Sequence, residues 1–155
     1  MRSKYKIASE RTSVEVNDNF SDEDVFVAES QHLIKKGLQG RGLYANRTYQ
    51  AGDVIGEYVG KILTPEEADA KQSHKQYMFE VWVQRHLVFV IDSAVNRYSS
   101  AMKFTNAADT IKQQNAEFKQ YDQHIYLVAI KKSKETLKFC LGMASVHINS
   151  YHRIL

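Results

Sequence analysis

Short runs of apolar residues along the chain predict a protein built mainly of β-strands. From about residue 25 onward these runs are rich in β-branched and aromatic residues, and several alternate apolar with polar positions. This pattern is typical of strands. We expect strands over 25–27, 42–45, 54–59, 77–83, 87–91 and 125–130, and therefore a mainly β fold.

Two segments between the expected strands predict short helices. Thr64 is a suitable N-cap, Pro65 suits the first helical position, and Glu67 follows three residues after the cap. In this capping-box pattern the threonine and glutamate side chains each accept a hydrogen bond from the other residue's backbone N–H. We expect this helix to continue to about Gln72, and a second short helix to lie over 99–106.

The length of the chain predicts one folded domain with polar ends. At 155 residues the chain has the size of one ordinary domain. Residues 1–24 are polar and show no sustained period, so we expect an arm there, then a folded domain over 25–142 and a divergent tail over 143–155. The sequence contains no internal repeat or low-complexity tract.

Composition excludes several classes of protein. Charged residues are 25% and hydrophobic residues 43% of the chain, which are ordinary globular values. No run approaches the ~20 apolar residues of a membrane span, and the N-terminus lacks the apolar core of a secretory signal. Cys140 is the single cysteine, which excludes an internal disulfide and a multi-cysteine zinc site. We expect a soluble, intracellular protein, and a nuclear location is compatible with this.

The distribution of charge and histidine argues against nucleic-acid and metal binding. The net charge is only +3 and the basic residues are spread out, whereas phosphate binding calls for clustered Lys and Arg. His147 and His152 are five residues apart, off the spacing that places two ligands on one helical face. We therefore expect no metal site and no direct contact with nucleic acid, and the sequence leaves the oligomeric state open.

Glycine-containing segments and the strands near them carry the main functional signal. Residues 40–45 read GRGLYA and residues 52–60 read GDVIGEYVG. The segments YMFEV, VFVIDS, AMKFTNAA and KETLKFCLG follow in that order, at 77–81, 88–93, 101–108 and 134–142. These segments and their order resemble the SET-domain family of protein-lysine methyltransferases, and the resemblance extends over most of the chain.

The resemblance implies both a fold and a cofactor. The SET fold consists of several small curved sheets with one or two short helices, and its C-terminal segment is tucked beneath a preceding loop in a pseudoknot. The cofactor implied is S-adenosylmethionine. The residues implied to bind it are Gly40, Arg41, Gly42, Leu43, Tyr44, Asn106 and Ala107. Tyr77 is implied to line the channel for the substrate lysine and to act in catalysis.

An ordinary structural explanation also stays open for five residues: Gly40, Gly42, Tyr58, Tyr77 and Asn106. Gly40 and Gly42 suit a simple tight turn. Asn106 suits a loop residue that hydrogen-bonds nearby backbone. Tyr58 and Tyr77 suit core aromatics on strands.

The chain departs from the family pattern at two places that bear on chemistry. Ala107 stands where most members of the family have a histidine. At the end of the motif, Phe139 and Leu141 stand where the family places tyrosines. Tyr151, in the tail, is the residue that would supply a phenol if the tail folds back over the site. The alternative is that the tail is simply a divergent end.

Two functions from different classes therefore follow from the sequence. The first is a protein-lysine N-methyltransferase that transfers a methyl group from S-adenosylmethionine to a lysine ε-amine, with histone tails as the expected substrate class. Such a transfer needs a neutral, aligned amine, and free lysine has a pKa of about 10.4. The second is a catalytically silent SET-like module that binds a peptide or partner. The two functions are distinguished by position 141, where the family places a tyrosine and this chain has a leucine.

Overall fold

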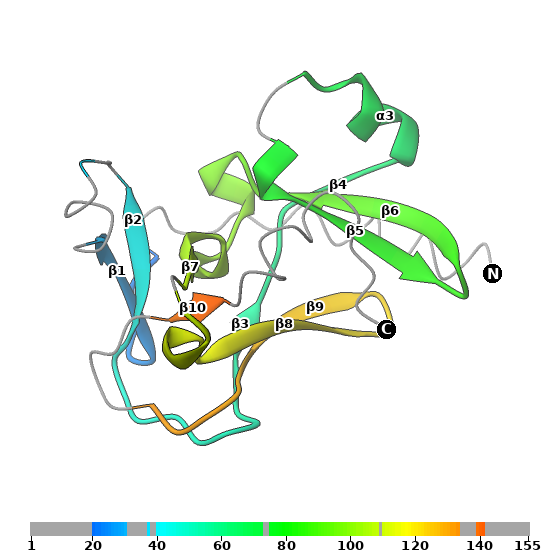
Figure 1. Ribbon diagram of the computed structural model, residues 1–155. Coiled ribbons are helices and arrows are strands. Elements are labelled where there is room, and N and C mark those ends of the chain that lie inside the picture. The colour runs from blue at the N-terminus through cyan, green and yellow to red at the C-terminus, as the bar shows by residue number, and fades with distance from the viewer. Residues whose placement is uncertain are drawn as a thin grey trace.

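The protein folds into three small sheets with little helix (Figure 1). The computed structural model describes residues 20–30, 37, 40–72, 75–108, 110–133 and 139–141. The strands, in chain order, are β1 (Val25–Glu29), β2 (Arg41–Ala45), β3 (Val54–Glu57), β4 (Lys61–Leu63), β5 (Met78–Val83), β6 (His86–Asp92), β7 (Asn106–Ala107), β8 (Ala116–Tyr121), β9 (His124–Ala129) and β10 (Cys140–Leu141).

The first and third sheets join strands that are close in sequence, whereas the second also pairs β3 with β9 and β10 with β7 and β8. The first sheet is the antiparallel pair β1–β2, and the third has the order β4-β6-β5. The second sheet has the order β3-β9-β8-β10-β7. All the strands that the sequence predicts are present, with ends that differ by a few residues. The prediction of a mainly β fold is confirmed.

Four further strands were not predicted from the sequence: β4, β7, β8 and β10. Strands β4, β7 and β10 contain only two or three residues each, too few to show a period. Strand β8 mixes charged residues with apolar ones, and only Ala116 and Phe118 are buried on its core side. Such strands form because their backbones pair with neighbouring strands. Local composition does not predict this pairing.

The first predicted helix is present as α3 (Pro65–Ala70), and it has the expected cap. Thr64 Oγ1 accepts from Glu67 N at 3.1 Å, and Glu67 Oε1 accepts from Thr64 N at 3.0 Å. The helix ends at Ala70, earlier than predicted.

The second predicted helix is a single 3-10 turn and not an α-helix. It is η4 (Ala101–Phe104), and Ser100 caps it by accepting a hydrogen bond from Met102 N. The other short 3-10 segments are η2 (Lys75–Tyr77), η3 (Asn96–Tyr98) and η5 (Ile111–Gln113). None of the helices in the described ranges is long and apolar enough to cross a membrane.

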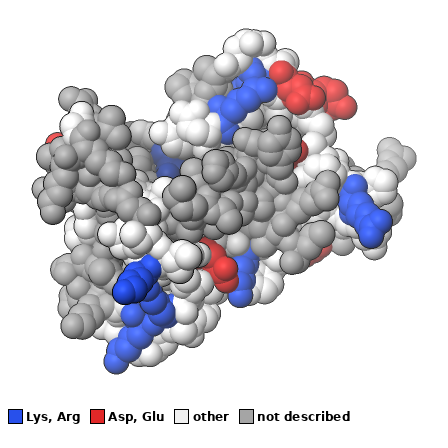
Figure 2. Space-filling model, in the orientation of Figure 1, with Lys and Arg blue, Asp and Glu red and all other residues white. Residues whose placement is uncertain are grey.

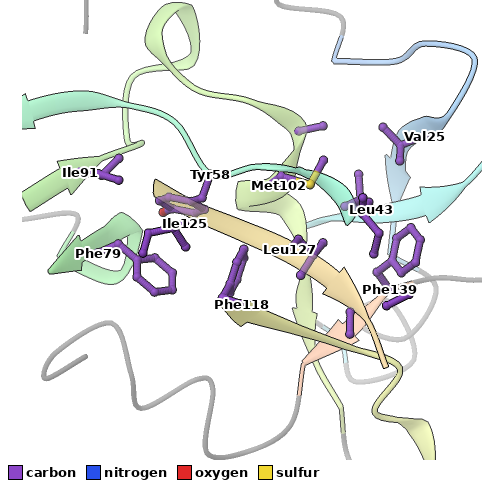
Figure 3. Close-up of a cluster of buried hydrophobic side chains, with 14 of the residues drawn as sticks. Val25, Leu43, Tyr58, Phe79, Ile91, Met102, Phe118, Ile125, Leu127 and Phe139 are labelled. Atoms are coloured by element: carbon purple, nitrogen blue, oxygen red, sulfur yellow. The ribbon is translucent and has the colours of Figure 1, made fainter. Parts of the chain in front are cut away.

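Aromatic side chains form the centre of the core (Figure 3). Tyr58, Phe79 and Phe118 pack edge to face, with ring centroids 4.9 to 5.4 Å apart, a favourable geometry for aromatic pairs. The Tyr58 hydroxyl donates to the Tyr77 carbonyl at 2.5 Å, and burial raises the pKa of Tyr58 well above its ordinary value. Tyr58 is therefore a core aromatic residue, the ordinary structural alternative that the sequence left open.

The C-terminal strand β10 passes between two strands that precede it in the chain. It pairs in parallel with β7 and with β8, so that Leu141 lies opposite Ala107 on one side and Ala116 on the other. Just before it, Phe139 N donates to Leu43 O at 2.8 Å. This insertion is compatible with the expected pseudoknot, and it brings β2, β7 and residues 139–141 together (Figure 1).

Phe20, which lies within the predicted arm, is part of the core. Its side chain is buried, and its ring packs against Phe104 in an edge geometry, with centroids 5.2 Å apart. Asp22 then stabilises the turn into β1 by accepting hydrogen bonds from the N–H groups of Asp24 and Val25. The last residues of the predicted arm thus pack on the domain.

Candidate functional site

Asn106 joins the Gly-x-Gly strand to the segment before β10. Its Nδ2 donates to Arg41 O at 3.0 Å and to Phe104 O at 3.3 Å. Because both partners are carbonyls, the amide orientation is determined and Oδ1 must face elsewhere. That oxygen is buried and has no hydrogen-bond partner among the described residues. A buried acceptor without a partner costs about 1–3 kcal/mol, so Asn106 offers a place for a ligand that donates a hydrogen bond.

Arg41 adds a positive charge next to Asn106. Its side chain is exposed, and its guanidinium lies 5.8 Å from the centroid of the Phe104 ring. Gly42, which follows it, is buried in strand β2 opposite Ala28. Gly42 is therefore an extended strand residue and not part of a tight turn. An extended backbone without a side chain allows a ligand to approach closely.

The side chains of Leu43 and Tyr44 face other parts of the protein. Leu43 is fully buried in the core. Tyr44 stacks on Phe26 at 5.1 Å and donates to Glu29 O at 3.1 Å. Ala107 is exposed, and its backbone pairs with β10. The side chains of Leu43 and Tyr44 are thus engaged by contacts within the protein.

Tyr77 supplies a phenol from a different part of the chain. Its carbonyl accepts hydrogen bonds from Tyr58 Oη at 2.5 Å and from Ser93 N at 3.1 Å. The backbone is thus fixed from two sides, at the end of η2 and directly before β5. The side chain is half-buried. The ring of Tyr77 is therefore carried on a backbone that is held in place by two hydrogen bonds.

Lys103 lies between Tyr77 and the residues around Asn106, and sequence reasoning missed it. Its Nζ donates to Ser93 O at 2.9 Å and to Asn96 Oδ1 at 2.5 Å. The same nitrogen lies 5.4 Å from the ring centroids of both Tyr77 and Phe104. The available signal was its place three residues before Asn106.

The residues around Lys103 form two groups. We call Arg41, Phe104 and Asn106 the Asn106 side, and Tyr77, Ser93 and Asn96 the Tyr77 side.

Burial and neighbouring charges act on Lys103 together. Burial lowers its pKa below the ordinary value of 10.5, Asp92 acts to raise the pKa, and Arg41 lowers it further. Asp92 is itself buried, with Oδ2 2.6 Å from Lys71 Nζ and Oδ1 accepting from Ala94 N. The candidate site therefore carries more positive than negative charge, which disfavours a further cation unless that cation loses its proton.

Comparison with known families decides which fold this is. The sequence model of the SET domain matches residues 40–136. The chain belongs to the SET-domain family. The matched range contains Arg41, Tyr77, Lys103 and Asn106. A search of curated proteins gave no match.

Two solved structures share the fold. The methyltransferase domain of human PR domain-containing protein 2 is 20% identical, with a TM-score of 0.60, and the match covers 78% of this chain and 77% of that one. A humanized mutant of the Chaetomium thermophilum Polycomb Repressive Complex 2 is also 20% identical, with a TM-score of 0.60. That match covers 79% of this chain but only 15% of the other. At this identity the likeness shows the fold, so the predicted SET fold is confirmed.

The positions where tyrosines were expected differ in their surroundings. Phe139 is fully buried and packs edge to face against Tyr49, with centroids 5.4 Å apart, so it is a core residue. The backbone of Leu141 lies opposite Ala107, the residue that follows Asn106. Tyr151 lies outside the described residues. Of the two positions, residue 141 is the one next to the candidate site.

Proposed function

We propose that this SET domain transfers a methyl group from S-adenosylmethionine to the ε-amine of a lysine in a protein. The observation that carries the proposal is the buried, unpartnered Oδ1 of Asn106, next to the exposed Arg41. Membership of the SET-domain family supports the same activity. Histone tails are the substrate class we propose, because the SET-domain family to which the chain belongs mostly acts on them.

The residues around Asn106 fit the amino-acid part of S-adenosylmethionine. Its ammonium is a donor that matches the Asn106 Oδ1 acceptor, and its carboxylate matches the Arg41 guanidinium. Gly42 leaves room for close approach to the β2 backbone. When bound, the cofactor supplies the methyl group as an electrophile on a sulfonium.

The residues of this chain would prepare the acceptor lysine in two ways. The positive charges of Arg41 and Lys103 lower the pKa of an incoming ammonium, so that it loses its proton to solvent more readily. The Tyr77 phenol, on a backbone held by Tyr58 and Ser93, orients the neutral amine and excludes water from one side. Binding and turnover depend on different residues under this proposal.

A second candidate function is a SET-like module that binds a peptide or partner without turnover. The specific observation in its favour is that Phe139 is a core residue and the chain carries a leucine at position 141. Tyr77 is then the phenol available among the described residues of the site. The two functions differ in methyl transfer and not in cofactor binding.

Substitution of Asn106 by alanine is expected to weaken the binding of S-adenosylmethionine by roughly 10- to 100-fold. The reason is that a hydrogen bond to a charged group contributes about 1.5–3 kcal/mol. Isothermal titration calorimetry of the wild-type chain and of Asn106→Ala measures this. Asn46→Ala is the matched control, because Asn46 Nδ2 also donates to a carbonyl, that of Asp22, away from the site. Equal affinities of wild type and Asn106→Ala, or no heat with the wild type at millimolar cofactor, would contradict the assignment.

A further inference from the structure

Lys103 is the side chain that contacts both sides of the candidate site. On the Tyr77 side its ammonium donates to Ser93 O and Asn96 Oδ1 and lies 5.4 Å from the Tyr77 ring. On the Asn106 side it lies 5.4 Å from the Phe104 ring. The ring of Phe20, which packs on Phe104, lies 5.8 Å from the same nitrogen.

These contacts engage most of the lysine ammonium. Two of its three N–H donors are directed at oxygens, and its charge faces three aromatic rings. Ser93 O belongs to the loop after β6 and Asn96 Oδ1 to η3, whereas the rings belong to η2, η4 and residue 20. One charge therefore holds segments that are remote in sequence around the Tyr77 ring.

We infer that Lys103 is a positioning residue, which holds the Tyr77 phenol in place relative to Asn106 so that the acceptor amine is aligned. The inference rests on the proposed function for its catalytic consequence. The contact between Lys103 and Tyr77 is observed in the structure and does not depend on the proposed function. The Tyr77 backbone is already fixed by Tyr58 and Ser93, so the freedom that Lys103 removes is that of the ring.

The charge of Lys103 makes this positioning dependent on pH. Its ammonium has a pKa below the ordinary 10.5 because of burial and of Arg41, with Asp92 acting in the opposite direction. The ionisable groups on the strands packed against η4 are Glu29 on β1, Arg41 and Tyr44 on β2, and Glu57 on β3. Glu57 Oε2 lies 3.0 Å from His124 Nδ1, and Lys71 forms an ion pair with Asp92. Loss of the Lys103 proton at alkaline pH would release the rings.

The test compares Lys103→Gln and Lys103→Arg with the wild type, and uses Lys112→Gln as the control for loss of an exposed lysine charge. Lys103→Gln is expected to lower kcat/KM for a histone-tail peptide by roughly tenfold, while the Kd for S-adenosylmethionine stays within about twofold. Lys103→Arg keeps the charge and is expected to retain most of the activity. As pH rises through the pKa of Lys103, wild-type activity should fall relative to Lys103→Arg, whose guanidinium stays charged.

A second measurement follows the Tyr77 ring directly, without turnover. The NMR resonances of the ring, assigned with Tyr77→Phe, are expected to shift in Lys103→Gln and not in Lys112→Gln. If Lys103→Gln does not fold, Asn96→Ala removes one oxygen partner from an exposed position and should give a smaller shift in the same direction. Unchanged ring resonances together with unchanged kcat/KM would overturn the inference. If the wild type transfers no methyl group, the proposed function fails and the ring resonances alone decide the role of Lys103.

Discussion

Replacement of Gly60 by alanine is expected to lower the free energy of unfolding by about 3 kcal/mol, which is at the upper end for overpacking. A Cβ at Gly60 would lie 2.3 Å from Asp92 O, 2.6 Å from Asp92 C and 2.9 Å from Ser93 N. All three atoms are backbone, so relief requires the end of β6 to move. Thermal unfolding should then occur roughly 6–12 °C lower for a domain of this size.

The displaced backbone at Gly60 is also the support of the candidate site. Asp92 forms the ion pair with Lys71, and Ser93 contacts both Tyr77 and Lys103.

Gly56→Ala is the matched control for Gly60→Ala, because the nearest atoms to its Cβ belong to the Met102 side chain, with Cε at 2.8 Å and Sδ at 2.9 Å. A flexible methionine can move aside, so the expected cost is below about 1.5 kcal/mol. Equal stability losses in the two variants would contradict the close approach at Gly60.

Substitution of Leu141 by tyrosine is expected to raise the rate of methyl transfer by on the order of 10²–10³, the effect of one positioned polar group. The family resemblance places a tyrosine at this position, and the structure places the backbone of residue 141 opposite Ala107, next to Asn106. The rate is measured as transfer of label from methyl-labelled S-adenosylmethionine to a histone tail, at saturating concentrations of both.

Phe139→Tyr is the control for adding a phenol at the wrong place. Phe139 is fully buried against Tyr49, so a new hydroxyl there would be buried in the core and cost about 1–3 kcal/mol if it finds no partner. It should lower stability and give no gain in rate. A rate increase in Phe139→Tyr but not in Leu141→Tyr would show that the phenol acts from the other position.

Local chemistry explains which parts of the fold could be predicted. The capping box of Thr64 and Glu67 involves residues three apart, so the start of α3 could be predicted from sequence alone. Strands with several β-branched residues, such as β6, were equally visible. In contrast, β7 and β10 exist because Asn106 and Cys140, which are remote in sequence, pair side by side. Only the family resemblance pointed to this threading.

The same distinction applies to the candidate site. Asn106 and Arg41 were predicted from motifs, and a hydrogen bond joins them in the structure. Lys103 was missed because its role depends on Phe20, Tyr77 and Ser93, none of which is close to it in sequence. No spacing rule relates these four residues, since the contacts depend on how η2, η4 and the end of β6 meet.

The charges of the described residues on one face of the molecule are distributed and do not form one block. On the face shown in Figure 2, the Lys and Arg side chains of the described residues occupy separate places, with acidic groups between some of them. This agrees with the modest net charge of +3. A protein substrate, held at the site of Asn106 and Tyr77, remains the partner that we propose.

Methyl transfer by the purified wild-type chain tests the proposed function most directly. The chain is incubated with methyl-labelled S-adenosylmethionine and core histones, and the labelled residues are identified by mass spectrometry. Label is expected on lysine ε-amines, reduced strongly in Asn106→Ala and increased in Leu141→Tyr. Cofactor binding by calorimetry with no label on any lysine, in the wild type or in Leu141→Tyr, would contradict it.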